Sequence, residues 1–185
     1  MYNTLESGTL RHSQSREDAL AETQQWFAAY TCAKHEKRVA DQLVQRGIEY
    51  FLPLYQAVHR WKDRRVQVRL PLFPGYVFVR LDLRDRLRVL QIPSVVRLVG
   101  ANGHPLPVEG REIQALRKGL TSAVVAEPYP YLTIGRRVRV KRGPLEGTCG
   151  ILMRKKNNVR FVISIDLIMR SISVEIDIVD LELVA

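Results

Sequence analysis

Several patterns that mark particular classes of protein are scarce or missing in this 185-residue sequence. Its two cysteines, Cys32 and Cys149, are far apart and lie in no metal-spaced motif. We expect free thiols in a reducing compartment, with a disulfide between them as the alternative. No apolar run approaches the length needed to span a bilayer, and the N-terminus lacks the apolar segment of a signal peptide. We therefore expect a cytoplasmic protein.

Residues that would support catalysis are also few. None of the four histidines sits with acids or cysteines at the spacing of a catalytic triad or a metal site; they are His12, His35, His59 and His104. The sequence contains neither a phosphate-binding P-loop nor a dinucleotide-binding fingerprint. We predict that the protein is not an enzyme and needs no cofactor or metal.

Acidic residues are outnumbered by basic ones. The chain has 29 Lys and Arg against 19 Asp and Glu, a formal net charge of +10 and a pI of about 10.0. Nine basic and four acidic residues lie between positions 34 and 69, and nine basic residues and one acidic residue lie between 134 and 160. Such a balance favours a polyanionic partner, most often nucleic acid.

The first two thirds of the chain predict a tail and an α+β domain. Residues 1–23 are polar and predict a mobile, disordered tail. In residues 24–121, strands are expected at 25–31, 48–54, 76–81 and 95–99, a basic hairpin at 56–70, and helices at 34–46, 84–91 and 109–120. The run at 76–81 is apolar on both faces and predicts a central, buried strand. Together these elements predict an antiparallel sheet with helices on one side, an α+β sandwich.

The last third has a different pattern. Residues 122–133 carry Pro128 and Pro130 and predict a linker. Residues 134–185 form a second unit, with strands expected at 137–140, 148–155, 159–168 and 172–184. Ile172, Val174 and Ile176 alternate with polar residues, a period of two that no amphipathic helix displays. The sequence therefore predicts a small five-stranded all-β barrel.

Two motifs resemble those of a known family. The stretch from Val138 to Gly150, with its Gly-Pro turn and two further glycines, resembles the KOW motif. Upstream, the stretches 26–30 and 71–79 resemble the NGN domain of NusG-type transcription factors, a likeness that extends over residues 25–185. The compact first domain, the basic hairpin and the Tyr50–Pro53 motif look closer to specialised paralogues such as RfaH and the antiterminators of polysaccharide operons. RfaH is known for a C-terminal domain that switches from helical hairpin to barrel, whereas the alternation at 172–178 predicts a KOW barrel from the outset.

The resemblance implies a transcription elongation and antitermination factor that binds RNA polymerase near its clamp and promotes processive elongation. Family NGN domains lay an apolar face on the polymerase clamp helices, and the matching positions are Tyr30, Phe73, Tyr76 and Phe78. The alternative is that all four are core residues. With the resemblance we expect partial exposure of Tyr30 and Phe73.

A second surface is implied for the non-template DNA strand. Its candidates are basic or hydrogen-bonding residues of the first helix and the hairpin, with an indole that would stack on a base: Lys34, His35, Arg38, Gln42, Arg46, Trp61, Lys62 and Arg64. The alternative is a solvated basic face that binds nothing.

The C-terminal unit has its own implied partner loop, formed by Gly143, Pro144, Leu145 and Gly147. The resemblance implies that the ribosomal protein NusE and Rho are candidate partners. We expect the protein itself to be a monomer. Two other functions fit the KOW motif. One is a ribosome-associated KOW RNA-binding protein, and the other is an RNA-modifying enzyme with a KOW accessory domain, which would need a cofactor or metal site.

Overall fold

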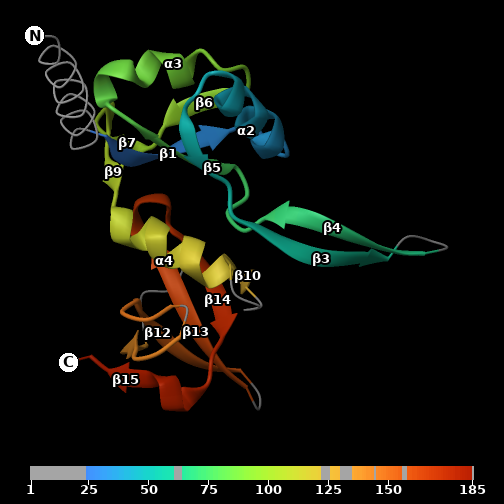
Figure 1. Cartoon of the computed structure of the whole chain (residues 1–185), viewed down its shortest axis with the longest axis vertical. Coiled ribbons are helices and arrows are strands. Elements are labelled where there is room, and N and C mark those ends of the chain that lie inside the picture. Colours follow the sequence, from blue (N-terminus) through green and yellow to red (C-terminus); the bar gives the residue numbers. More distant parts are fainter. Residues whose placement is uncertain are drawn as a thin grey trace, which may run out of the picture.

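A computed structural model describes residues 24–60, 64–121, 126–129, 135–143, 145–155 and 158–184 (Figure 1). The predicted tail at 1–23 lies outside these residues, as do Trp61, Lys62 and Pro144. In the part of the chain that is described, no helix is both long enough and apolar enough to cross a membrane.

The N-terminal half is built on an antiparallel sheet of strands β1 (Gln25–Thr31), β2 (Glu49–Phe51), β5 (Tyr76–Leu81), β6 (Val95–Leu98) and β9 (Pro107–Val108). Its order is β2-β5-β1-β6, and β9 pairs with β1. The two central strands pair with Phe27 opposite Val79. Phe27, Ala28, Val77 and Val79 are all buried, because both faces of this strand pair are covered. The prediction of a central strand at 76–81 is confirmed.

Helices cover both faces of this sheet. Val39 and Leu43 of α2 (Glu36–Gln45) and Val89 of α3 (Arg86–Leu90) form one apolar cluster with Phe27 and other residues of the sheet. Helix α4 (Gly110–Thr121) contributes Ile113 and Leu116 to a second cluster, which contains Trp26, Ala28 and Phe78. Residues 26 to 29 of β1 therefore alternate between the two clusters, as the period of a strand requires. The expectation that the helices lie on one side is wrong for α4, which lies below the sheet in Figure 1 while α2 and α3 lie above it.

Two hairpins extend from this half. Strands β3 (Leu54–Arg60) and β4 (Arg65–Pro71) form a two-stranded ribbon that projects to the right in Figure 1. Its base is closed by the Leu72 N–H, which donates to the Pro53 carbonyl at 2.9 Å. The smaller hairpin pairs β7 (Gly100–Ala101) with β8 (His104–Pro105).

The C-terminal half is all β, as predicted. Six antiparallel strands lie in the order β10-β14-β13-β12-β11-β15. Their bounds are β10 Ala126–Tyr129, β11 Arg136–Val140, β12 Cys149–Lys155, β13 Asn158–Ile165, β14 Arg170–Glu175 and β15 Leu181–Leu183. The absence of a side chain at Gly150 is needed for this packing, since a Cβ there would lie 2.5 Å from the Val162 carbonyl oxygen and 2.6 Å from the Phe161 ring.

Strand β10 falls inside the segment expected to be a linker. It pairs with β14, with Pro128 opposite Ile172. A strand is not predicted here because proline has no N–H to donate to a neighbouring strand. The strand forms all the same because it lies at the edge of the sheet, where one side of the backbone needs no partner strand.

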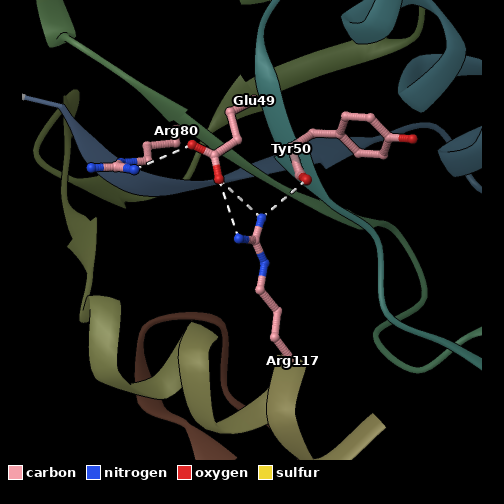
Figure 2. A network of polar contacts seen from close by, with 4 residues as sticks. All are labelled: Glu49, Tyr50, Arg80 and Arg117. Carbon is pink, nitrogen blue, oxygen red and sulfur yellow. Dashed lines mark hydrogen bonds and ion pairs between the residues drawn. The ribbon is translucent and has the colours of Figure 1, made fainter. Parts of the chain in front are cut away.

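An arginine on α4 ties this helix to the N-terminal sheet (Figure 2). The Arg117 guanidinium donates to Oε1 of Glu49 at 3.2 Å and to the Tyr50 carbonyl at 3.4 Å. Glu49 also pairs with Arg80 at 3.3 Å. The guanidinium carbon lies 4.7 Å from the centroid of the Trp26 ring and 5.3 Å from that of Phe51. Because the ion pair is partly exposed, we attribute most of the stabilisation to stacking on the two rings.

Replacing this arginine should weaken the attachment of α4. We expect Arg117→Ala to lower the free energy of unfolding by about 1.5 kcal/mol, because two cation–π contacts and the bonds to Glu49 are lost. Arg117→Lys should retain only part of the lost stability, since the lysine ammonium lacks the planar, forked shape of a guanidinium. Urea unfolding measures the difference. Gln114→Ala, an exposed position on the same helix, is the control and should leave the stability nearly unchanged; equal effects of the two alanine variants would contradict this account.

The opposite side of α4 faces the C-terminal sheet across a cleft of about 680 Å³. Its lining includes Glu109, Arg111 and Glu112 of α4 and Cys149 and Asp166 of the C-terminal half. Burial raises the pKa of Glu112 to about 7, with the nearby carboxylates of Glu109 and Asp166 acting in the same direction against the opposing charge of Arg111. The folded chain therefore holds a proton on Glu112 at a pH where the unfolded chain has lost it.

The Glu112 carboxyl should make stability fall as pH rises. Its pKa is higher in the folded chain than the ordinary value of 4.5, so the cost of ionising it appears between pH 4.5 and about 7 and is complete above that range. We expect Glu112→Gln to melt about 2 °C above the wild type at pH 8 and together with it at pH 4. Thermal unfolding followed by circular dichroism measures this. Asp41→Asn, on α2 and remote from the cleft, serves as the control; a pH-independent effect of Glu112→Gln would refute the assignment.

Candidate functional site

The turn that leads into β5 joins three elements. Gly75 has a φ of 85°, a conformation that glycine adopts without strain. Its N–H donates to Oε1 of Glu36, the first residue of α2, at 2.7 Å, and its carbonyl accepts from the N–H of Thr31 at the end of β1 at 2.8 Å. The Glu36 side chain is buried, with the residue only 4% exposed. The end of β1, the start of α2 and the start of β5 are thereby held together.

An exposed tyrosine lies over this turn. A Cβ on Gly75 would come within 3.3 Å of the Tyr30 ring, so the absence of a side chain lets the ring lie against the backbone. The Tyr30 and Tyr76 rings are tilted against each other with centroids 5.4 Å apart. The Arg97 guanidinium lies 5.6 Å from the Tyr30 centroid. Tyr30 is 37% exposed, and Arg97, the residue opposite it on β6, is exposed as well.

The four aromatic positions expected to contact a partner therefore separate into two pairs. Tyr30 is exposed and Tyr76 is half-buried. Phe73 is 1% exposed and Phe78 is 0% exposed. The expectation that Phe73 is partly exposed is wrong, because its ring packs edge-on against Phe78 with centroids 5.7 Å apart and belongs to the cluster beneath α4. Of these four positions, only Tyr30 and Tyr76 offer aromatic surface, and Arg97, which lies opposite Tyr30 on β6, was not anticipated from sequence.

The basic surface centres on α2. Lys34, which lies just before this helix, and Arg38, in its first turn, are both exposed. His35 is half-buried, and its Nδ1 lies 2.8 Å from the Ser94 hydroxyl. The ring is thus anchored to the loop before β6, which leaves it less free to read a base edge. Gln42 donates to Gln45 at 3.3 Å on the exposed side of the helix.

The end of α2 is joined to α3 by a reciprocal pair of arginines. Arg46 donates to the Arg88 carbonyl at 3.0 Å, and Arg88 donates to the Arg46 carbonyl at 2.8 Å. Each guanidinium is thereby held against the backbone of the other residue. Arg88 extends the basic surface onto α3, and no local sequence signal pointed to it, because the two residues are 42 positions apart. Arg64 is exposed just before β4, while Trp61 and Lys62 lie outside the described residues.

The expected partner loop of the C-terminal half lies between β11 and β12. Gly143 and Gly147 have φ values of 94° and 80° and shape the turn. The Gly147 N–H donates to the Val140 carbonyl at 2.8 Å. Leu145 is 3% exposed and packs into the apolar cluster. Its side chain therefore supports the loop from inside, and the expectation that it contacts a partner is wrong for this conformation.

In the described part of the chain, no group of three or more His, Cys, Asp or Glu residues is placed to bind a metal ion.

Comparison with known proteins gives a consistent result. Residues 24–117 match the family described as transcription termination factor nusG. The transcription termination/antitermination protein NusG of Deinococcus radiodurans is 29% identical over 155 residues, which cover 69% of this chain and 82% of that protein. The protein of the same name from Lactococcus lactis is 28% identical over 86% of this chain and 92% of its own length. A solved structure described as domain interaction in Thermotoga maritima NusG has a TM-score of 0.55 and 20% identity, and covers 89% of this chain and 99% of that one. This last likeness shows the fold alone.

Exposed cations of α2 should make nucleic-acid binding salt-dependent. We expect the full chain to bind single-stranded DNA with an affinity that falls steeply as salt rises. The double variant Lys34→Asn and Arg38→Gln should reduce the slope of log K against log salt by about 1.4, since each phosphate contact on a single strand contributes about 0.7. Asn is chosen at position 34 because φ is 64° there.

Fluorescence anisotropy across a salt series measures this slope. Arg111→Gln, on the far helix α4, is the matched control and should leave the slope unchanged. An unchanged slope in the α2 variant would mean that this helix presents a solvated basic face and nothing more.

Proposed function

Because the chain belongs to the NusG family, we propose that it is a transcription elongation and antitermination factor that binds RNA polymerase near its clamp and promotes processive elongation. The observation that carries this proposal is the exposed Tyr30 ring, which lies over the Gly75 turn beside Tyr76. A tyrosine supplies a large amphipathic contact surface at low entropic cost, which suits the centre of a protein interface. Phe73 and Phe78 are buried beneath this surface, where their packing supports β5, the strand that carries Tyr76.

The basic surface fits the same role. A factor that sits beside the DNA channel of polymerase meets phosphates on one side and protein on the other. The exposed Lys34 and Arg38 lie at the start of α2, the end that Glu36 holds to the Gly75 turn, and Arg46 and Arg88 add positive charge at the other end of the helix. We assign this charge to the non-template strand, held mainly through its phosphates. Binding the closed form of polymerase better than the open form then shifts the enzyme towards the processive state.

The finer assignments follow from the same proposal. We place the protein in the cytoplasm as a non-enzymatic monomer, and among the specialised, RfaH-like factors on the strength of its basic hairpin. Unlike the helical hairpin for which RfaH is known, the C-terminal half here is a β-sheet that shares a cluster with α4. NusE or Rho would meet the loop between β11 and β12 through its backbone and the exposed Glu146, since Leu145 points inward.

Removing the Tyr30 ring should weaken polymerase binding. We expect Tyr30→Ala to reduce affinity for core RNA polymerase about 30-fold, the loss that corresponds to about 2 kcal/mol for an interface aromatic. Tyr30→Phe, which keeps the ring, should bind almost as well as the wild type. Biolayer interferometry with immobilised core enzyme measures these affinities. Val44→Ala, a similarly exposed apolar position on α2, is the control; normal binding by a folded Tyr30→Ala protein would rule out this surface.

A further inference from the structure

The β3–β4 ribbon has two faces of opposite character. Residues opposite each other across the ribbon lie on one face, and the register pairs Tyr55 with Leu70 and Ala57 with Val68. These four residues and Val66 are all half-buried, and they form what we call the apolar face. The other face carries Gln56, Val58, Arg65, Gln67 and Arg69, which are all exposed, and we call it the polar face.

The apolar face lacks a sheet or core to cover it. Among the strands that the structure describes, β3 and β4 pair only with each other. Of the apolar face, Tyr55 alone packs against a core cluster of the described residues. Figure 1 shows the ribbon projecting away from both halves of the molecule. Seven residues per strand give it a reach of about 20 Å. A two-stranded ribbon is marginally stable in water, so one with an apolar face is suited to a partner that covers that face.

The charge of the chain argues against two possible occupants. A second copy would bring another net charge of +10 onto the first, with Arg65 and Arg69 on the reverse of each ribbon. Nucleic acid would find cations on the polar face. The apolar face of the described ribbon carries no lysine or arginine, and beside its five half-buried residues the register places His59 there, opposite Val66. The face therefore fits a protein surface that is itself apolar.

The position of the ribbon's base indicates which protein would bind the apolar face. Tyr55 packs against the same cluster as Tyr76, the partner of Tyr30. The apolar face thus begins at the cluster whose edge carries the tyrosine pair. We propose that the apolar face of the ribbon seats on RNA polymerase as a second contact, beyond the Tyr30 surface, while the polar face turns its arginines towards the nucleic acid. This inference rests on the proposed function, since it takes polymerase as the partner.

The test changes the polarity of the apolar face without changing its shape. Threonine is close to valine in size and retains β-branching, so the double variant Val66→Thr and Val68→Thr keeps the strand preference of β4 while placing two hydroxyls on the face. Burying hydroxyls without partners should reduce the affinity of the full chain for core RNA polymerase by about 30-fold. Gln67→Thr, between the two positions but on the polar face, is the matched control and should bind within about twofold of the wild type.

A second measurement does not depend on substitution. Hydroxyl-radical footprinting of the wild-type chain with and without core polymerase should show protection of Tyr55, Val66 and Leu70 in the complex, with the exposed Val58 of the polar face remaining reactive. This result holds whether or not the threonine variant keeps its ribbon. Unprotected apolar-face residues in a complex that forms normally would overturn the inference.

The other outcomes distinguish this inference from the proposed function. Full binding by the threonine variant, together with loss of binding by Tyr30→Ala, would overturn the ribbon contact and leave the proposed function standing. Failure of the wild type to bind polymerase at all would overturn both. A wild-type dimer in light scattering that the threonine variant abolishes would assign the face to a second copy and overturn the inference.

Discussion

The buried hydrogen bond between the Gly75 N–H and the Glu36 carboxylate is the constraint on which the N-terminal half depends. A carboxylate that is 4% exposed is costly to bury unless it accepts hydrogen bonds, and here the acceptor meets a backbone donor at 2.7 Å. The bond fixes the start of α2 against the turn before β5. Since Gly75 also accepts from Thr31, the two central strands and the helix above them share one point of attachment. The aromatic surface and the basic surface both begin at this point.

The position of α4 follows from a different kind of contact. Glu49 at the edge strand β2 pairs with Arg80 within the sheet and with Arg117 on the helix. The Arg117 side chain spans from α4 to the rings of Trp26 and Phe51, so its charge and its flat shape are both used. Helix α4 thereby closes the sheet face opposite α2 and offers its other side to the C-terminal strands.

Much of the fold could be predicted because its signals are local. The Pro-Gly turn, the apolar run at 76–81 and the alternation in β14 each reflect a period or a turn that a few neighbouring residues specify. The side of the sheet on which α4 lies could not be predicted, since helical periodicity does not say which face a helix covers. The burial of Phe73 was missed because the stretch from 70 to 79 is apolar almost throughout and the pattern does not distinguish inside from outside. The contact between Arg46 and Arg88 joins distant positions, and only the folded chain brings them together.

The apolar cluster beneath α4 has a consequence for how the molecule unfolds. It contains Trp26 and Phe78 from the first sheet, Ile113 from the helix, and Phe161 and Val174 from the second sheet. Two sheets that share a contiguous cluster cannot lose their packing independently, because opening either one exposes apolar surface that belongs to the other. The N-terminal and C-terminal halves therefore behave as a single cooperative unit in this arrangement. On heating, unfolding should give one heat-absorption peak in calorimetry instead of two. Helix α4, which lies between the two sheets, is therefore stabilised by packing on both of its sides.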